Sequence, residues 1–231
     1  MLPENFTDLI KCSFDEFVTF LFERPVPSGE SSFAEVARSG ETDKWNPWYY
    51  DSHVSFDPFC LCDHYSRLFR EPRFLVDRFS RSQLEQGFWA AQSPTLECSA
   101  YHLTWNREVS FEVREECVRS MYFLFRELFI DEPLQTSVCM WWDSFCYGWH
   151  CGNRKRSRGG EDLLMQDVMF ETLSRILALE SDICQGAALH GLSHLHHPQT
   201  ETIIERYLSN HPSLSDEWRQ AALAAARFEL M

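Results

Sequence analysis

The chain has 231 residues, enough for one ordinary hydrophobic core or two small ones. Apolar residues make up 44% and aromatic residues 15% of it, a composition that excludes a globally disordered chain. The formal net charge of −14 argues against nucleic acid as a partner, because nucleic-acid binding relies on basic surfaces that displace counterions from phosphates. An acidic surface instead favours solubility or a basic protein partner.

Membrane insertion and secretion are not expected. No apolar run approaches the roughly 20 residues that a membrane-spanning helix needs. The first ten residues carry Glu4 and Asp8 and lack the basic segment of a secretory signal. The nine cysteines are an odd number at irregular spacings, whereas a secreted disulfide framework usually shows an even set. These features predict a cytoplasmic protein with reduced thiols.

The N-terminal part of the chain contains one clear helix and a long irregular segment. Ser13 and Glu16 have the spacing of a capping box and precede an apolar helical stripe, which a proline-rich segment ends. Residues 25–56 show no clear hydrophobic period and are predicted as a long loop. A loop of this length is usually functional or contains a secondary-structure element that the pattern does not reveal. We expect the aromatic residues of Trp45–Tyr50 to pack onto the body of the protein.

Several helices are predicted in the middle of the chain. Asp57 before Pro58 is typical of a helix start, and Ser82 with Glu85 has the spacing of another capping box. The longest predicted helix runs from Thr104 or Asn106 to Phe129. Shorter ones are predicted around 74–79, at 137–147 and at 161–180. The basic run 153–160 between the last two is expected to be an exposed, flexible loop and the best place for an internal boundary.

Three short helices are predicted between Ser181 and Phe228, each with apolar residues at spacings of three and four. Helices of three to four turns are marginal alone and become stable by packing these faces together. No segment of convincing length has the period of a β-strand. The predicted fold class is therefore all-α, in a single domain over residues 1–231.

Residues 183–209 combine a first helix rich in small residues, a turn at His197-Pro198 and a second helix with the paired aliphatics Ile203-Ile204. This hairpin resembles a HEAT-type repeat, although His197 stands where that family usually has Asp. The resemblance covers this hairpin only and implies an irregular α-α superhelix or HEAT-like helical array, with residues 161–231 as its C-terminal part. Proteins of this kind are mainly protein-binding scaffolds, but fold analogy alone does not assign a function.

The densest aromatic stretch, 141–149, is one candidate site. Adjacent helical residues differ by 100°, so the two neighbouring tryptophans cannot share one narrow stripe. We expect one of them to meet a second layer, a neighbouring loop or a partner. One interpretation is that these rings pack as core. The other is a ligand or partner groove, since tryptophan is often an interface anchor. That groove would be formed by Trp141, Trp142, Asp143, Trp149 and His150, with Asp143 as its charged member.

His190 and His194 are four residues apart, so their imidazoles share one helix face and could hold one metal ion. A metal site needs a third ligand, and no Glu follows any His, which excludes the zinc-protease motif and the His-Glu dipeptides of HEAT-like hydroxylases. The cysteine–histidine groups at 60–64 and 146–151 have zinc-ligand types at the wrong spacing. We therefore predict no metal and no cofactor, and interpret the histidines as a polar face.

The preferred function is a non-enzymatic, cytoplasmic protein–protein interaction scaffold with an acidic surface and a basic partner. One specific version is an immunity- or antitoxin-like protein that covers a basic toxin surface. The alternative is an enzyme or small-molecule binder that uses an aromatic pocket around Trp141–Trp149. A HEAT-like DNA glycosylase would need a basic groove, which the net charge argues against. The sequence does not indicate an oligomeric state.

Overall fold

The structure, a computed structural model, describes residues 6–26, 47–132, 134 and 136–230. This part of the chain is mainly helical and divides into two compact units. The N-terminal unit comprises Met1–Ser120 and Leu134–Ser137, and the C-terminal unit comprises Met121–Pro133 and Val138–Met231. The basic run 153–160 therefore lies inside the second unit. The organisation as a single domain stays a prediction.

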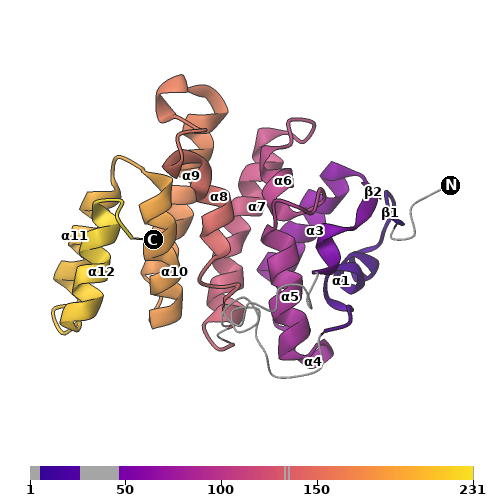
Figure 1. Cartoon of the computed structure of the whole chain (residues 1–231), viewed down its shortest axis with the longest axis horizontal. Coiled ribbons are helices and arrows are strands. Elements are labelled where there is room, and N and C mark those ends of the chain that lie inside the picture. Colours follow the sequence, from indigo (N-terminus) through magenta and orange to yellow (C-terminus); the bar gives the residue numbers. More distant parts are fainter. Residues whose placement is uncertain (1–5, 27–46, 133, 135, 231) are drawn as a thin grey trace. The chain divides into compact units, whose positions relative to one another are not determined.

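The N-terminal unit contains two strands and a layer of short helices (Figure 1). Its elements are β1 (Phe6–Leu9), α1 (Phe14–Phe22), the 3-10 helix η2 (Trp48–Tyr50), β2 (His53–Phe56), α3 (Pro58–Arg70), α4 (Phe74–Arg78), α5 (Arg81–Gln92), α6 (Ala100–Trp105) and most of α7 (Phe111–Leu124). Helix α1 packs against α3 and α5, and α6 packs against the same two helices. The buried faces of these helices form the core of this unit.

The two strands correct the all-α prediction. β1 and β2 pair in parallel, with Phe6 opposite His53 and Leu9 opposite Phe56. Each strand has only four residues, too few for an alternating pattern to stand out in the sequence. A parallel pair also needs a long crossover connection, so no hairpin turn marks it. That crossover includes α1 and residues outside the described ranges.

Capping side chains begin two helices as predicted. The Ser13 side chain accepts a hydrogen bond from the Glu16 N–H, and the Glu16 carboxylate accepts one from the Ser13 N–H at 2.7 Å. Asp57 accepts bonds from two N–H groups at the start of α3, where Pro58 is the first helical residue. A capping box satisfies N–H groups that have no partner within the helix.

Two other predicted helices differ from the structure. The N-cap of α5 is Ser80, with Gln83 closing its capping box, so the helix begins before the expected Ser82. The Gln83 side chain accepts the Ser80 N–H as a glutamate would, so Ser80 and Gln83 form the capping box in place of Ser82 and Glu85. The long helix predicted from Thr104 or Asn106 to Phe129 begins later, at Phe111, because α6 ends at Trp105 and a short turn separates it from α7.

The aromatic segment before β2 packs as predicted where the structure describes it. Tyr49 is buried, and the Trp48 ring meets Phe20 of α1 edge-on at 5.1 Å. The guanidinium of Arg24 lies over the Trp48 ring, 4.2 Å from its centroid. Trp45 lies outside the described residues.

The C-terminal unit is built around α10 (Figure 1). Its elements are the end of α7, the π-helical turn η3 (Phe125–Phe129), α8 (Trp141–His150), the 3-10 helix η4 (Arg156–Arg158), α9 (Gly160–Leu177), α10 (Asp182–Leu195), α11 (Thr200–Asn210) and α12 (Asp216–Ala226). Helix α10 packs against α8, α9 and α12, and α11 packs against α12 and α9. The three predicted C-terminal helices are all present, and the predicted helix at 137–147 begins and ends a few residues later, as α8.

A glycine brings α10 close to α8. A Cβ added at Gly191 would lie 2.6 Å from the Trp142 Cβ and 2.7 Å from a Leu173 methyl group, so only glycine fits. Both adjacent tryptophans are fully buried, and they face different neighbours. The Trp141 ring meets Phe129 edge-on, and Trp142 packs where α10 approaches. The close contact between these two helices positions the site described below.

Ion pairs anchor the basic run to α9. Arg154 pairs with Asp162 at 3.0 Å, and Arg156 pairs with Asp167 at 2.5 Å. The run is largely exposed, as predicted, and its flexibility stays a prediction. Among the residues that the structure describes, no helix combines the length and the hydropathy that crossing a membrane requires.

Candidate metal centre

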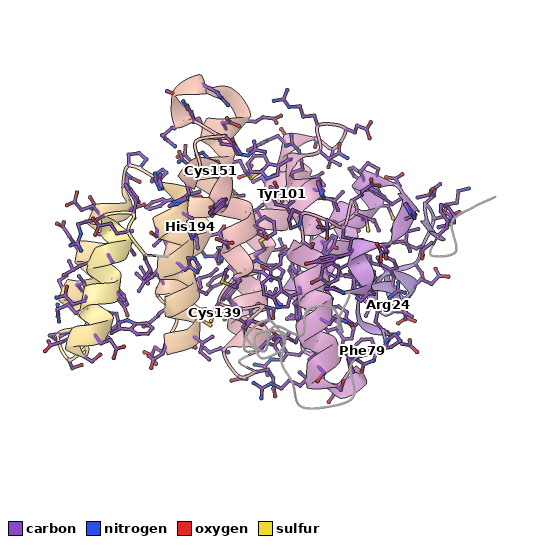
Figure 2. The ribbon with its side chains drawn as sticks, viewed as in Figure 1. Arg24, Phe79, Tyr101, Cys139, Cys151 and His194 are labelled. Atoms are coloured by element: carbon purple, nitrogen blue, oxygen red, sulfur yellow. The ribbon has the colours of Figure 1, made fainter. Side chains whose placement is uncertain are left out.

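Helices α8 and α10 bring a group of ionisable side chains together within the C-terminal unit. Asp143 and His150 lie on α8, seven residues apart and therefore on the same side after two turns. His190 and His194 lie one turn apart on the facing side of α10 (Figure 2 labels His194). The close approach at Gly191 lets short side chains from the two helices meet.

Three potential ligand atoms converge between these helices. His190 Nε2 lies 2.7 Å from His194 Nε2. Asp143 Oδ1 lies 3.2 Å from His194 Nε2 and 3.9 Å from His190 Nε2. Within the described ranges, no other group of three His, Cys, Asp or Glu side chains brings its ligand atoms within 4.8 Å of one another.

The cluster is buried on its α10 side and open on its α8 side. The side chain of His194 is 3% exposed and that of His190 is 16% exposed, whereas Asp143 is 32% exposed. The Tyr147 ring, half-exposed, lies 5.6 Å from the His194 ring. An ion could therefore reach the site from the side of Asp143 and Tyr147.

Burial and the neighbouring charges set the protonation states. Burial, followed by repulsion from His190 and other histidines, lowers the pKa of His194 to about 4, so this ring is neutral at neutral pH. Burial raises the pKa of Asp143 above its ordinary value, and the smaller opposing effect of His190 does not reverse this. Among the described residues no Arg or Lys pairs with Asp143.

No arrangement of protons satisfies every polar atom of a neutral cluster, because a neutral imidazole has one N–H and one lone pair. If His190 donates to His194 Nε2, the Asp143 oxygen faces the same lone pair, and the His194 proton sits on Nδ1. That Nδ1 is buried and has no hydrogen-bond partner in the part of the chain that the structure describes. If His194 Nε2–H donates to Asp143 instead, Nδ1 keeps a buried, unpaired lone pair. An unsatisfied buried group of this kind costs about 1–3 kcal/mol.

A metal cation would relieve the opposition of lone pairs among His194 Nε2, His190 Nε2 and Asp143 Oδ1 by accepting all three. The proton on His194 Nδ1 would still have no partner within the described part of the chain. Imidazole and carboxylate are ordinary zinc ligands, with Zn–N and Zn–O distances of about 2.0–2.2 Å. In a tetrahedral complex, such ligands place two coordinating atoms roughly 3.3 Å apart. The observed separations of 2.7, 3.2 and 3.9 Å lie around that value. The residues present fit the ion with small side-chain movements.

The structure distributes the sequence-predicted site residues unevenly. Asp143 lies in the cluster with His190 and His194, and the His150 ring lies beside it, with its centroid 4.7 Å from that of His194. Trp141 and Trp142 are fully buried, and Trp149 is 5% exposed, so these rings pack in the interior of the unit. The sequence argument against a metal site was the missing third ligand, and Asp143 offers one. Whether the aromatic stretch also contacts a ligand or partner stays a prediction.

The cysteine–histidine groups do not assemble comparable sites. Cys60 Sγ lies 3.6 Å from His64 Nε2, which also contacts a backbone carbonyl at 3.0 Å. Cys146 is fully buried, whereas Cys151 on the same segment is exposed. Neither group brings a third side chain within ligand distance among the described residues.

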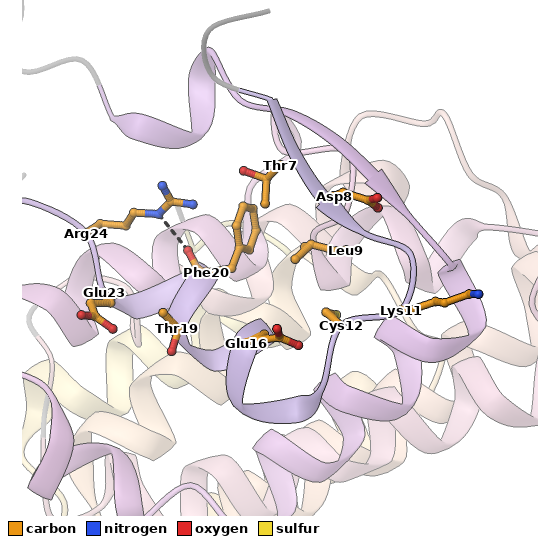
Figure 3. A pocket seen from close by; sticks show the side chains of 10 residues that line it. All are labelled: Thr7, Asp8, Leu9, Lys11, Cys12, Glu16, Thr19, Phe20, Glu23 and Arg24. Carbon is orange, nitrogen blue, oxygen red and sulfur yellow. Dashed lines mark hydrogen bonds between the residues drawn. The ribbon is translucent and has the colours of Figure 1, made fainter. Parts of the chain in front are cut away.

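The N-terminal unit has a hollow of about 520 Å³ beside β1 and α1 (Figure 3). It is lined by Thr7, Asp8, Leu9, Lys11, Cys12, Glu16, Thr19, Phe20, Glu23 and Arg24. The Arg24 Nε–H donates to the Phe20 carbonyl at 2.9 Å, and this bond holds the side chain along α1. The two cationic side chains among these residues are offset by three carboxylates, so the lining specifies no ligand class.

Comparisons with protein-family models, with curated proteins and with solved structures find no match to this chain. A function therefore has to be argued from the site itself.

Proposed function

We propose that this protein binds a divalent transition-metal ion, zinc first among them, through Asp143, His190 and His194. The observation that carries the proposal is the convergence of two imidazole nitrogens and a carboxylate oxygen in a cluster to which the described residues add no Arg or Lys. Two histidines and one carboxylate are a recurrent ligand set for zinc and also for non-haem iron. The bound ion would join α8 to α10 and add its binding free energy to the stability of the C-terminal unit.

The test uses the untagged full chain, stripped of metal with a chelator. Calorimetric titration with Zn²⁺ should show one site per chain. Each of the variants Asp143→Asn, His190→Ala and His194→Ala should weaken binding by more than about 100-fold, because each removes a direct ligand. His102→Ala, which removes an imidazole from the N-terminal unit, is the matched control and should bind as the unaltered chain does. Equal losses in all four variants, or no binding by the unaltered chain, would refute the proposal.

A protein-binding scaffold with a HEAT-like hairpin is a second proposal. It is supported by a hydrogen bond between α10 and α11, in which the Tyr207 hydroxyl donates to Gln185 Oε1 at 2.7 Å. It is further supported by His197, which stands where HEAT-type repeats usually have Asp. Its Nδ1 accepts the Gln199 N–H at 3.2 Å, a hydrogen bond that an Asp side chain would accept at this turn. The net charge of −14 favours a basic partner.

Reconstitution with a captured partner at fixed stoichiometry would test the scaffold. Binding that survives both chelator and Asp143→Asn would separate this function from the metal site. Failure to reconstitute a one-to-one or other simple complex from purified components would count against it.

A further inference from the structure

The end of α10 has an unfavourable backbone that points to a second role beside the proposed ligands. His196 follows the last residue of the helix with φ 52° and ψ 37°, the left-handed conformation. Glycine or asparagine usually occupies this position, because a Cβ crowds the following carbonyl oxygen. A histidine here must be held by its surroundings.

Contacts on two sides hold His196 in place. Its ring stacks on Phe228 with centroids 4.4 Å apart and planes inclined by 16°. Phe228 is the only other non-glycine residue with positive φ among those described, at 63°. On the other side, the Gln166 amide donates to the His196 carbonyl at 3.4 Å. The Ser193 hydroxyl also donates to the Leu230 carbonyl at 3.1 Å, which fixes the C-terminal segment against α10.

The side chain held in this way contacts His150 of α8. His196 Nε2 lies 3.3 Å from His150 Nδ1. This contact occupies one nitrogen of the His150 ring, and its Nε2 makes no hydrogen bond within the described part of the chain. The His150 ring lies edge-on to His194, with centroids 4.7 Å apart. The corresponding distance between His190 and His194 is 4.6 Å.

His194 thus lies between two imidazoles at nearly equal distances. Two imidazoles that share one tetrahedral zinc ion have ring centres about 5 Å apart, given Zn–N distances of 2.0–2.1 Å. A histidine that binds metal through one nitrogen usually makes a hydrogen bond with the other, which fixes its tautomer and orientation. His196 is placed to supply that bond to His150.

We infer that His150 is the fourth ligand of the ion, through Nε2, and that His196 is its positioning residue. This inference rests on the metal site proposed above. Binding requires the His150 ring to turn inward, because only the other three ligands now have their atoms within 4.8 Å of one another. The result is a closed site of three histidines and one aspartate. Closed four-ligand sites are typical of structural zinc, so the ion would join the two helices and leave no position for a substrate.

Cobalt substitution tests the coordination number directly. Co²⁺ bound to the unaltered full chain should give the intense visible bands of a tetrahedral ion. His150→Ala should still bind Zn²⁺ through three ligands, about 10- to 100-fold more weakly, with weaker and shifted cobalt bands. Added imidazole should restore those bands by filling the vacated position. Tyr147→Phe, which keeps the ring beside His150, is the control and should leave both affinity and spectrum unchanged.

His196→Asn tests the positioning role, because asparagine tolerates the left-handed conformation but cannot reach His150 in the same way. The zinc affinity should fall about 10- to 100-fold while the melting temperature of the metal-free chain stays the same or rises. A lower melting temperature with unchanged cobalt bands would overturn the positioning role. Unaltered affinity and spectrum in His150→Ala would overturn the fourth ligand and leave the three-ligand site standing. If the unaltered chain bound no Zn²⁺ at all, the proposed function itself would be overturned.

Discussion

The C-terminal unit contains two histidine–aspartate contacts with similar distances and different surroundings. His194 Nε2 lies 3.2 Å from Asp143, and His197 Nε2 lies 2.9 Å from Asp167. The second contact includes a cation, since Arg156 lies 2.5 Å from the same carboxylate oxygen. In the contact between His194 and Asp143, the neighbour of the carboxylate is a second histidine, His190, and no Arg or Lys lies there in the described part of the chain.

This difference decides what each pair can do. Burial raises the pKa of Asp167, but the hydrogen bonds from Arg156 and His197 lower the pKa by more than burial raises it. The net shift is therefore downward. For Asp143 the net shift is upward, because burial dominates. His197 Nδ1 also accepts a hydrogen bond, whereas His194 Nδ1 is buried and has no partner among the described residues. The pair with an arginine is complete as a structural contact, and the other pair has no Arg or Lys beside it among the residues that the structure describes.

The largest expected effect concerns the core beneath the cation-free pair. Trp142 is fully buried against α10, so Trp142→Ala should lower the free energy of unfolding by about 3–5 kcal/mol, through lost burial and a cavity. Phe170, which stacks on His197 at 4.0 Å beside the complete pair, is only partly buried, so Phe170→Ala should cost clearly less. Urea denaturation compares the two. Similar losses would mean that the two pairs rest on equally packed surroundings.

Bound zinc should stabilise the chain through the Asp143–His194 pair, and the Asp167–His197 pair should play no part in this stabilisation. At a free Zn²⁺ concentration 100 times the Kd, binding adds about 2.7 kcal/mol to the free energy of unfolding. For a chain of this size that raises the Tm by about 5–10 °C. Asp143→Asn should abolish the rise, and Asp167→Asn should retain it. Calorimetry with and without chelator measures both, and a rise lost equally in the two variants would contradict the distinction.

Local sequence signals predicted the parts of this site that lie within one helix. His190 and His194 share a face because they are four residues apart on α10. The start of α3 at Asp57 was equally readable. In each case the interacting groups lie within a few residues, so the spacing alone fixes their geometry.

The third ligand could not be predicted in this way. Asp143 belongs to a different helix, and its position depends on how α8 packs against α10. That packing depends on Gly191 fitting against Trp142, a complementarity of shape that no periodicity records. The pairing of β1 with β2 was missed for a related reason, because their partners lie far apart in sequence. The role of His196 was not predicted, since its left-handed backbone is not visible in the sequence.

A pair of glycine variants on α10 tests the close approach itself. Gly191→Ala places a methyl group against the Trp142 Cβ, which cannot move without the backbone, and should cost about 1–3 kcal/mol. A Cβ at Gly186 would lie 3.4 Å from the Trp218 ring, an ordinary contact. Gly186→Ala should therefore stabilise the chain by up to about 1 kcal/mol, through better helix propensity. Melting temperatures should move in opposite directions, and a common direction would mean that α8 and α10 are not in close contact here.

The smallest expected effect separates the two aspartates without any metal. Asp167 is 37% exposed, so solvent screening limits its contribution, and Asp167→Asn should cost about 1 kcal/mol at neutral pH. Its lowered pKa means that the contribution is present above the ordinary aspartate pKa of 3.8 and is lost as the pH falls through the folded-state value below it. The stability difference between the unaltered chain and Asp167→Asn should therefore shrink in acid.

Asp143→Asn should behave differently in the chelated chain, because a carboxylate with a raised pKa is less favourable in the folded state at neutral pH than in the unfolded state. Replacing it should leave the free energy of unfolding unchanged or slightly higher, while it removes metal binding. Denaturant titrations of both variants at neutral and acidic pH measure these signs. A clear loss for Asp143→Asn without metal would make this aspartate a structural residue like Asp167. The absence of a cation beside it would then have to be explained by its bond to His194 alone.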